Sequence, residues 1–167
     1  DCDPGHDDMV ALMTAVAGPA IELLGVSTVA GNQSGEKTAF NARRVLTLIG
    51  RHDIPVARGA DRPLVRRLHT AQNIHGVSGL DGAELPEPEM ELEPDGAVDF
   101  LRRRIRAQDE RVTIIPTGPL TNIALLLAAD PEIAERIEQI VLMGGAIAES
   151  NVTPAAEFNI YVDPEAA

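Results

Sequence analysis

The sequence predicts an α/β protein in which helices cover both faces of a mostly parallel β-sheet. Short apolar segments rich in β-branched residues alternate with segments of helical periodicity along the whole chain, which is typical of this class. The segment 21–30, for example, is apolar and β-branched, as expected for a parallel strand buried on both faces. The 167 residues are enough for one domain with a sizeable core.

The predicted elements follow one another in the order of a Rossmann-like three-layer α/β/α architecture. Helices are predicted over 9–17, 34–49, 95–106 and 120–129, with a further short helix beginning at Asp130-Pro131. Strands are predicted over 21–30, 54–57, 111–115 and 139–143. Residues 60–94 are predicted to be mostly loop, because Pro, Gly and acidic residues occur there without periodicity.

Both ends of the chain interrupt this pattern. The strand that should lead into Asp1 is absent, and Asp163-Pro164 has the residue types of a helix that is just beginning. We therefore expect a single domain over 1–167 that is truncated at both ends.

The composition excludes several classes of partner. The net charge is −12, from 14 Lys and Arg against 26 Asp and Glu, which argues against a nucleic-acid partner. The basic run at 102–106 falls in a helical pattern, and we interpret it as a solvated helix face. No apolar run is long enough to span a membrane. The single cysteine, Cys2, excludes an internal disulfide and favours a reducing compartment, so we expect a cytoplasmic protein.

The first eight residues, Asp1-Cys2-Asp3-Pro4-Gly5-His6-Asp7-Asp8, hold four carboxylates. Asp1 and Asp3 are expected at the C-terminal tip of a strand, and Asp7 and Asp8 in the first turn of a helix, beside the positive end of its dipole. Four carboxylates this close repel one another, and a hard divalent cation such as calcium would offset that repulsion. The alternative is that Asp7 and Asp8 only cap the helix, although capping needs one acid.

Other predicted strand tips bring polar residues to the same edge of the sheet. Asn32, Thr117, Met143 and Asn159 each follow or end a predicted strand or turn there. The edge is rich in acids and amides and poor in lysine, which suits a neutral, hydroxyl-rich ligand with a cation better than a phosphate. His75 lies in a glycine-rich stretch that suits a mobile lid over a pocket, although an ordinary surface histidine fits the composition equally well.

These motifs together resemble the inosine-uridine-preferring nucleoside hydrolases. The matching blocks occur in the family's order and cover the whole chain; they are Asp1–Asp8, Val29–Gln33, Asn73–Gly76, Pro116–Asn122, Val141–Gly145 and Ala156–Asn159. The resemblance implies calcium-dependent hydrolysis of the N-glycosidic bond of a ribonucleoside to ribose and free base. It also implies a homo-oligomer, and a C-terminal part, outside this sequence, that holds the leaving-group acid and another calcium ligand.

The resemblance assigns roles to individual residues. It implies calcium binding by Asp3, Asp8 and the carbonyl of Thr117, with Asp3 also acting as the general base toward a metal-bound water. The implied substrate contacts come from Asp7, Asn32 and Asn159 to the ribose hydroxyls, Asn151 and Glu157 toward the 5′ and 3′ side, Met143 against the sugar, and His75 near the base.

Two other functions remain open from the sequence. One is a nucleoside- or ribose-binding module that has lost turnover. The other is a phosphatase of the haloacid dehalogenase type, which also begins with Asp-x-Asp at a strand tip. The only lysine, Lys37, falls on a helix flank, which argues against a phosphate site. The sequence does not indicate a preference for purine or pyrimidine bases.

Overall fold

The computed structural model describes residues 1–167, and its elements alternate between strand and helix as the sequence predicts. The helices are α1 (His6–Ala17), α2 (Gly35–Leu48), α3 (Gln72–His75), α4 (Ala97–Arg106), α5 (Thr121–Ala129), the 3-10 helix η1 (Pro131–Arg136) and α6 (Phe158–Val162). The strands are β1 (Val26–Thr28), β2 (Val56–Arg58), β3 (Val112–Ile114) and β4 (Ile137–Ile140). None of the helices combines the length and the apolar character that crossing a membrane requires.

The strands form two parallel pairs that the N-terminal segment joins. β1 pairs with β2, and β3 pairs with β4. Between the pairs, the Cys2 N–H donates to the carbonyl of Ser27 at 3.0 Å, and the Asp1 nitrogen donates to the carbonyl of Ile115 at 3.1 Å. Cys2 also forms a parallel bridge with Thr28. The order across the fold is therefore β4, β3, the N-terminal segment, β1 and β2, with every pairing parallel.

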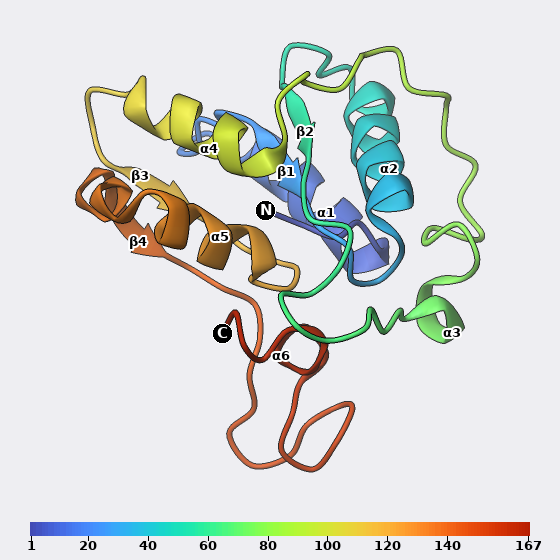
Figure 1. Ribbon diagram of the computed structural model, residues 1–167. Helices are drawn as coiled ribbons and strands as arrows, with labels where there is room; N and C mark the ends of the chain where they lie inside the picture. Colours follow the sequence, from blue (N-terminus) through green and yellow to red (C-terminus); the bar gives the residue numbers. More distant parts are fainter.

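Helices lie on both sides of the strands, which completes an α/β fold with three layers (Figure 1). One apolar cluster packs α1 and α2 against β1 and β2; it consists of Cys2, Leu12, Val26, Ala42, Val45, Leu46, Ile54, Val56 and Leu80. A second cluster packs α4, α5 and η1 against β3; it consists of Ile105, Ile114, Leu120, Ile123, Leu126 and Ile133. Cys2 therefore serves the core, as its alternation with Asp1 and Asp3 predicts.

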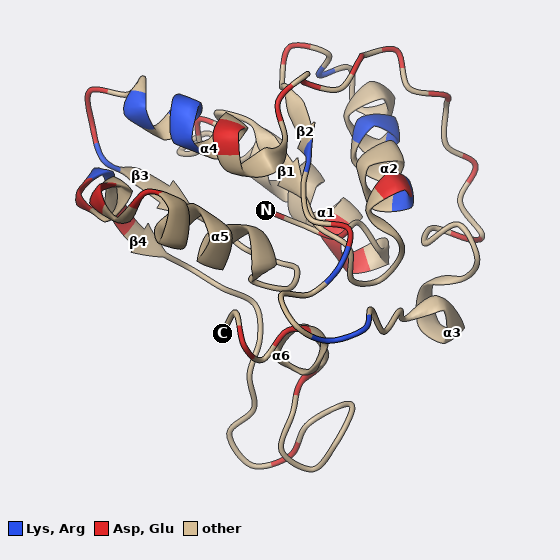
Figure 2. Cartoon of the chain, viewed as in Figure 1, with Lys and Arg blue, Asp and Glu red and all other residues tan.

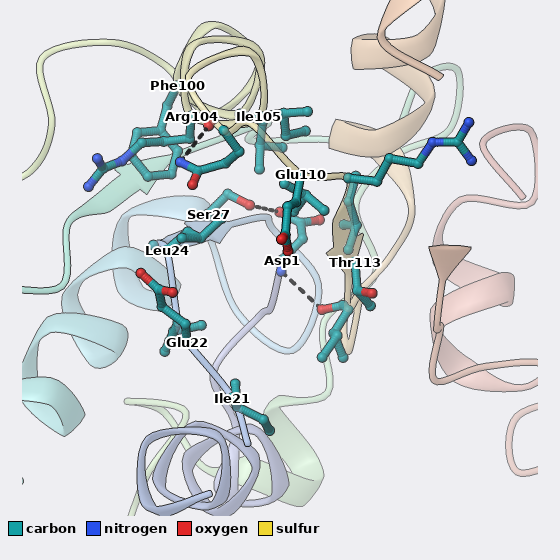
Figure 3. A pocket seen from close by; sticks show the side chains of 18 of the residues that line it. Asp1, Ile21, Glu22, Leu24, Ser27, Phe100, Arg104, Ile105, Glu110 and Thr113 are labelled. Carbon is teal, nitrogen blue, oxygen red and sulfur yellow. Dashed lines mark hydrogen bonds between the residues drawn. The ribbon is translucent and has the colours of Figure 1, made fainter. Parts of the chain in front are cut away.

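The strand predicted over 21–30 is shorter in the structure. Only Val26–Thr28 is paired as a strand, and residues 21–25 line one wall of a groove of about 450 Å³ between β1 and β3 (Figure 3). Phe100 and Ile105 from α4 also line this groove. The five residues at the start of the predicted strand face this groove and not a hydrogen-bonded neighbour, which explains why strand propensity alone overestimates β1.

Two further boundaries differ from the prediction. β4 spans 137–140 and not 139–143, although Val141 and Met143 still donate their N–H groups to the carbonyls of Ile114 and Pro116. The helix predicted to begin at Asp163 is absent, and residues 164–166 form a turn that follows α6. Residues 60–94 are mostly loop, as predicted. They contain no strand, and their only helix is the single turn of α3.

Candidate functional site

The candidate site is built on Asp3 and Asp8, two buried carboxylates at the edge of the sheet where the N-terminal segment enters α1. Asp3 is fully buried and Asp8 is 2% exposed. Asp3 follows the residues that join the two strand pairs, and Asp8 lies in the first turn of α1, where the helix dipole favours a negative charge. The helix begins at His6, directly after the Pro4-Gly5 turn and three residues before the predicted segment 9–17, and its first turn holds Asp7 and Asp8 as predicted.

Asn32 connects the two carboxylates. Its backbone N–H donates to Asp3 Oδ2 at 2.7 Å, and its side-chain Nδ2 donates to the Asp3 carbonyl at 3.1 Å and to Asp8 Oδ2 at 3.3 Å. Asp8 also accepts hydrogen bonds from the Gly5 N–H at 3.2 Å and from the Thr117 hydroxyl at 2.6 Å. Every one of these donors is neutral, so hydrogen bonds orient the carboxylates but no cationic side chain compensates their charge.

Burial and mutual repulsion change the acidity of both groups. Burial, with the charge of Asp8 as a smaller cause, raises the pKa of Asp3 well above its ordinary value. Burial also raises the pKa of Asp8, although its hydrogen bond from Thr117 opposes this shift. Without a bound cation, ionisation of Asp3 and Asp8 therefore costs free energy. A cation at this position would favour the ionised forms.

The residues at the site fit a hard cation in part. Asp3 Oδ1 is buried and has no hydrogen-bond partner, so one carboxylate oxygen is free to bind an ion. Gly118 leaves the space beside this oxygen open, because a Cβ at that position would lie 2.8 Å from Asp3 Oδ1. No group of three or more His, Cys, Asp or Glu side chains converges anywhere in the structure. Any ion held by Asp3 and Asp8 would consequently need additional oxygen ligands, such as backbone carbonyls.

Asn159 links the acidic pair to the last strand tip. Its Nδ2 donates to the carbonyls of Thr117 at 2.8 Å and Met143 at 3.1 Å, and it lies 3.2 Å from the Met143 sulfur. Glu157 caps α6, because its Oε2 accepts from the N–H groups of Asn159 at 2.9 Å and Ile160 at 3.3 Å. The structure therefore joins Asp3, Asn32, Asp8, Thr117, Asn159 and Met143 in one network.

His75 approaches the same edge from the loop that contains α3. Its Nε2 lies 4.0 Å from Asp7 Oδ1, and its side chain is 12% exposed, whereas that of Asp7 is 71% exposed. Burial lowers the pKa of His75, Asp7 partly offsets this effect, and His6 adds to it. His6, which the sequence gives no functional role, packs against the His75 ring with 5.4 Å between ring centroids.

One expectation about the acidic stretch needs correction. The four carboxylates do not converge: Asp1 Oδ1 accepts from Ser27 Oγ at 2.7 Å and from Asn122 Nδ2 at 2.8 Å, on the side that faces the groove of Figure 3. Asn151 lies exposed in the loop before α6, and no contact of its side chain joins it to the network.

Comparisons with known proteins agree with this arrangement. The family model described as inosine-uridine preferring nucleoside hydrolase matches residues 1–167. A protein of Photobacterium profundum named pyrimidine-specific ribonucleoside hydrolase RihA is 58% identical over the whole chain, which covers 54% of that protein. A protein of the same name from Shewanella is also 58% identical, and the chain covers 52% of it. The chain thus spans about half the length of these curated relatives.

Solved structures of similar proteins share the fold. The purine-preferring ribonucleoside hydrolase from Gardnerella vaginalis superposes with a TM-score of 0.93 at 35% identity, over 99% of this chain and 54% of that one. A plant nucleoside hydrolase gives a TM-score of 0.90 at 36% identity, over 98% of this chain and 52% of that one. Because the family model matches every residue and the site network carries its motifs, the chain belongs to the inosine-uridine preferring nucleoside hydrolase family.

Proposed function

We propose that the protein hydrolyses the N-glycosidic bond of ribonucleosides and releases ribose and a free base. The observation that carries this proposal is the buried Asp3, whose Oδ1 has no partner, beside Asp8, Asn32 and Thr117. Membership of the nucleoside hydrolase family supports the reaction class. The site also lacks the lysine and arginine side chains that a phosphate substrate would require, because every hydrogen bond to Asp3 and Asp8 comes from a neutral group.

The proposal includes a calcium ion at the acidic pair. The carboxylates of Asp3 and Asp8 would hold it, together with the carbonyl of Thr117, which now accepts a hydrogen bond from Asn159. When bound, the ion makes a neighbouring water more acidic and binds hydroxyl oxygens of the substrate. The unpartnered Asp3 oxygen and the charge that no cationic side chain compensates support this assignment.

Asp3 is the proposed general base. Its Oδ1 would take a proton from the water that attacks the anomeric carbon, while Asn32 holds Oδ2 in place through its backbone N–H. Departure of the nucleobase leaves positive charge on the ribose ring, as in an oxocarbenium-like transition state. The carboxylates of Asp3, Asp8 and Asp7 stabilise that charge more than they stabilise the neutral substrate.

The remaining side chains would bind the sugar. Asp7, Asn32 and Asn159 are proposed to bind ribose hydroxyls, with Asn151 and Glu157 on the 5′ and 3′ side and Met143 packed against the ring. Glu157 and Asn159 already meet at the start of α6, which supports a shared role. Asn151 would have to approach from its exposed loop.

We infer pyrimidine ribonucleosides as the first substrates to test, because relatives that are 58% identical carry pyrimidine-specific names. The 35% identical structure of a purine-preferring enzyme shows that the same fold accommodates the other class. The family resemblance further favours a homo-oligomer, and the single Cys2 favours a reducing compartment such as the cytoplasm.

The deciding experiment measures ribose release by the natural full-length protein from uridine, cytidine, inosine and adenosine, with calcium or with a chelator. We expect release that differs among the bases and stops on chelation. Binding of nucleosides without release would instead identify a binding module. Inorganic phosphate from phosphate esters, with no ribose from nucleosides, would identify a phosphatase.

A further inference from the structure

The His75 ring lies in a slot formed by Gly5 and His6 at the start of α1. Gly5 provides the floor, because a Cβ at this position would lie 2.7 Å from both Cε1 and Nδ1 of the ring. The backbone N–H of His6 donates to His75 Nδ1 at 3.3 Å. The His6 ring stacks on the His75 ring at an interplanar angle of 28°, with 3.2 Å between the two Nδ1 atoms.

The same His6 side chain also contacts the loop that carries His75. Its Nε2 lies 3.0 Å from the carbonyl oxygen of Asp81, six residues after His75. Asp81 in turn accepts hydrogen bonds from the N–H groups of Val77 at 2.8 Å and Ser78 at 2.9 Å, which closes the loop into a compact turn. One side chain of α1 therefore contacts both the ring and the turn.

The opposite side of this loop is attached to α2 and the residues before it. Gln33 Nε2 donates to the carbonyl of Gly76 at 2.8 Å, and Asn41 Nδ2 donates to the carbonyl of Ser78 at 2.9 Å. These bonds hold the backbone but do not contact the imidazole. The orientation of the His75 ring consequently depends on His6 and Gly5.

We propose that His6 is a positioning residue that fixes the His75 ring so that its Nε2 faces the substrate side of the site, next to Asp7. Both contacts of His6 with the ring involve Nδ1, which leaves Nε2 as the ring nitrogen that a departing base can meet. This inference rests on the proposed nucleoside hydrolase function and adds to it a residue that governs how the base is held.

The geometry gives a reason for a histidine at position 6. A planar ring covers the face of His75, and a nitrogen at its far end reaches the Asp81 carbonyl. An alanine would remove both of these side-chain contacts and leave only the hydrogen bond from the backbone N–H of position 6 to hold the His75 ring. A glutamine retains a donor at about the position of Nε2, and therefore keeps the contact with the turn while it loses the stacking.

The test compares His6→Ala, His75→Ala and the double variant in the natural full-length protein, with steady-state ribose release as the readout. We expect His6→Ala to raise KM about fivefold, the effect of one lost side-chain hydrogen bond, with a smaller change in kcat. His75→Ala should raise KM by a similar factor, and the double variant should show no further rise, since His6 acts through His75. His6→Gln should recover part of the loss.

A matched control is His52→Ala, which removes an exposed histidine whose Nδ1 lies 3.6 Å from Glu89, away from the His75 loop. It should leave KM and kcat unchanged. Additive effects of the two single variants, or an unchanged KM in His6→Ala, would overturn the inference.

A second readout separates this inference from the proposed function. Amide hydrogen exchange of residues 76–81 should accelerate in His6→Ala and not in His52→Ala, whether or not the protein releases ribose. Absence of ribose release from the unmodified protein contradicts the proposed function alone. Unchanged exchange of residues 76–81 in His6→Ala contradicts the positioning role of His6 alone.

Discussion

The carboxylates of the candidate site and those beside α4 carry the same charge in opposite environments. Asp3 and Asp8 are buried, accept hydrogen bonds from neutral donors, and have raised pKa values. Asp130 is partly buried but lies 2.8 Å from the Arg106 guanidinium and 3.5 Å from that of Arg102, and its pKa is lowered by the hydrogen bond from Arg106. Figure 2 shows the basic positions of α4, in blue, on a part of the molecule separate from the acidic start of α1, in red.

The difference shows which charges the chain itself compensates. The basic run of α4 pairs with nearby acids, since Arg103 also lies 2.7 Å from Glu93 and 3.1 Å from Asp95. This agrees with the interpretation of the run as a solvated helix face. The buried pair has no such partner within the chain, so its charge compensation has to come from a bound cation or from protons. We therefore expect the proposed function to depend on Asp3 and Asp8, the pair whose charge no side chain of the chain compensates.

The largest expected effect tests whether Asp3 acts in chemistry. Asp3→Asn removes the proposed base and one carboxylate of the cation site, and keeps the volume and the acceptor for the Asn32 N–H. We expect kcat for ribose release to fall by about a thousandfold or more, while circular dichroism and the melting temperature stay close to those of the unmodified protein. Turnover close to normal would refute the mechanism.

A smaller effect is expected on cation binding. Asp8→Ala removes one carboxylate of the proposed calcium site and the acceptor for the Thr117 hydroxyl. Calcium affinity measured by titration calorimetry should fall by roughly tenfold to a hundredfold. Asp130→Ala is the matched control because it removes a carboxylate that is paired with Arg106 and lies outside the site, and it should bind calcium as the unmodified protein does. Equal affinities in the two variants would place the ion elsewhere.

The opposite pKa shifts predict opposite dependence of stability on pH. A carboxyl group with a raised native pKa binds more protons in the folded than in the unfolded state, so it lowers stability as pH rises from its unfolded pKa near 3.8 through the native value. In the presence of chelator, the melting temperature of Asp3→Asn minus that of the unmodified protein should therefore increase as pH rises from about 4 to about 7. Calcium should remove this difference in slope. Parallel curves in chelator would argue against a raised pKa.

The smallest effect is expected at the surface pairs. Arg106→Ala breaks the contact with Asp130, in which the arginine side chain is 45% exposed and is therefore screened by water and salt. The melting temperature should change by about 1–2 °C at most, and by less in high salt. A larger loss would show that the α4 pairs contribute to stability as much as buried contacts, and would weaken the contrast with the acidic pair.

Much of the site could be predicted from the sequence because strand tips of a parallel sheet meet at one edge. The sequence places Asp3, Asn32 and Thr117 at such tips, and hydrogen bonds join these three through Asp8. Asn159, which the sequence also predicts at a strand tip, lies in α6 instead and reaches the network through its hydrogen bond to the Thr117 carbonyl. The strand boundaries were harder to predict. Residues 21–25 have strand propensity, yet they border the groove between β1 and β3, and a strand needs a hydrogen-bonded neighbour as well as propensity.

The sequence by itself determined the alternation of strands and helices, the acidic turn at Pro4-Gly5 and the family, since each depends on local periodicity or on a contiguous motif. Tertiary structure decided which acids act together: Asp1 is drawn to Ser27 and Asn122, whereas Asp3 and Asp8 share Asn32. It also decided that His6 meets His75, 69 positions away in the chain. Contacts over such separations depend on how layers pack, and no local pattern in the sequence encodes that packing.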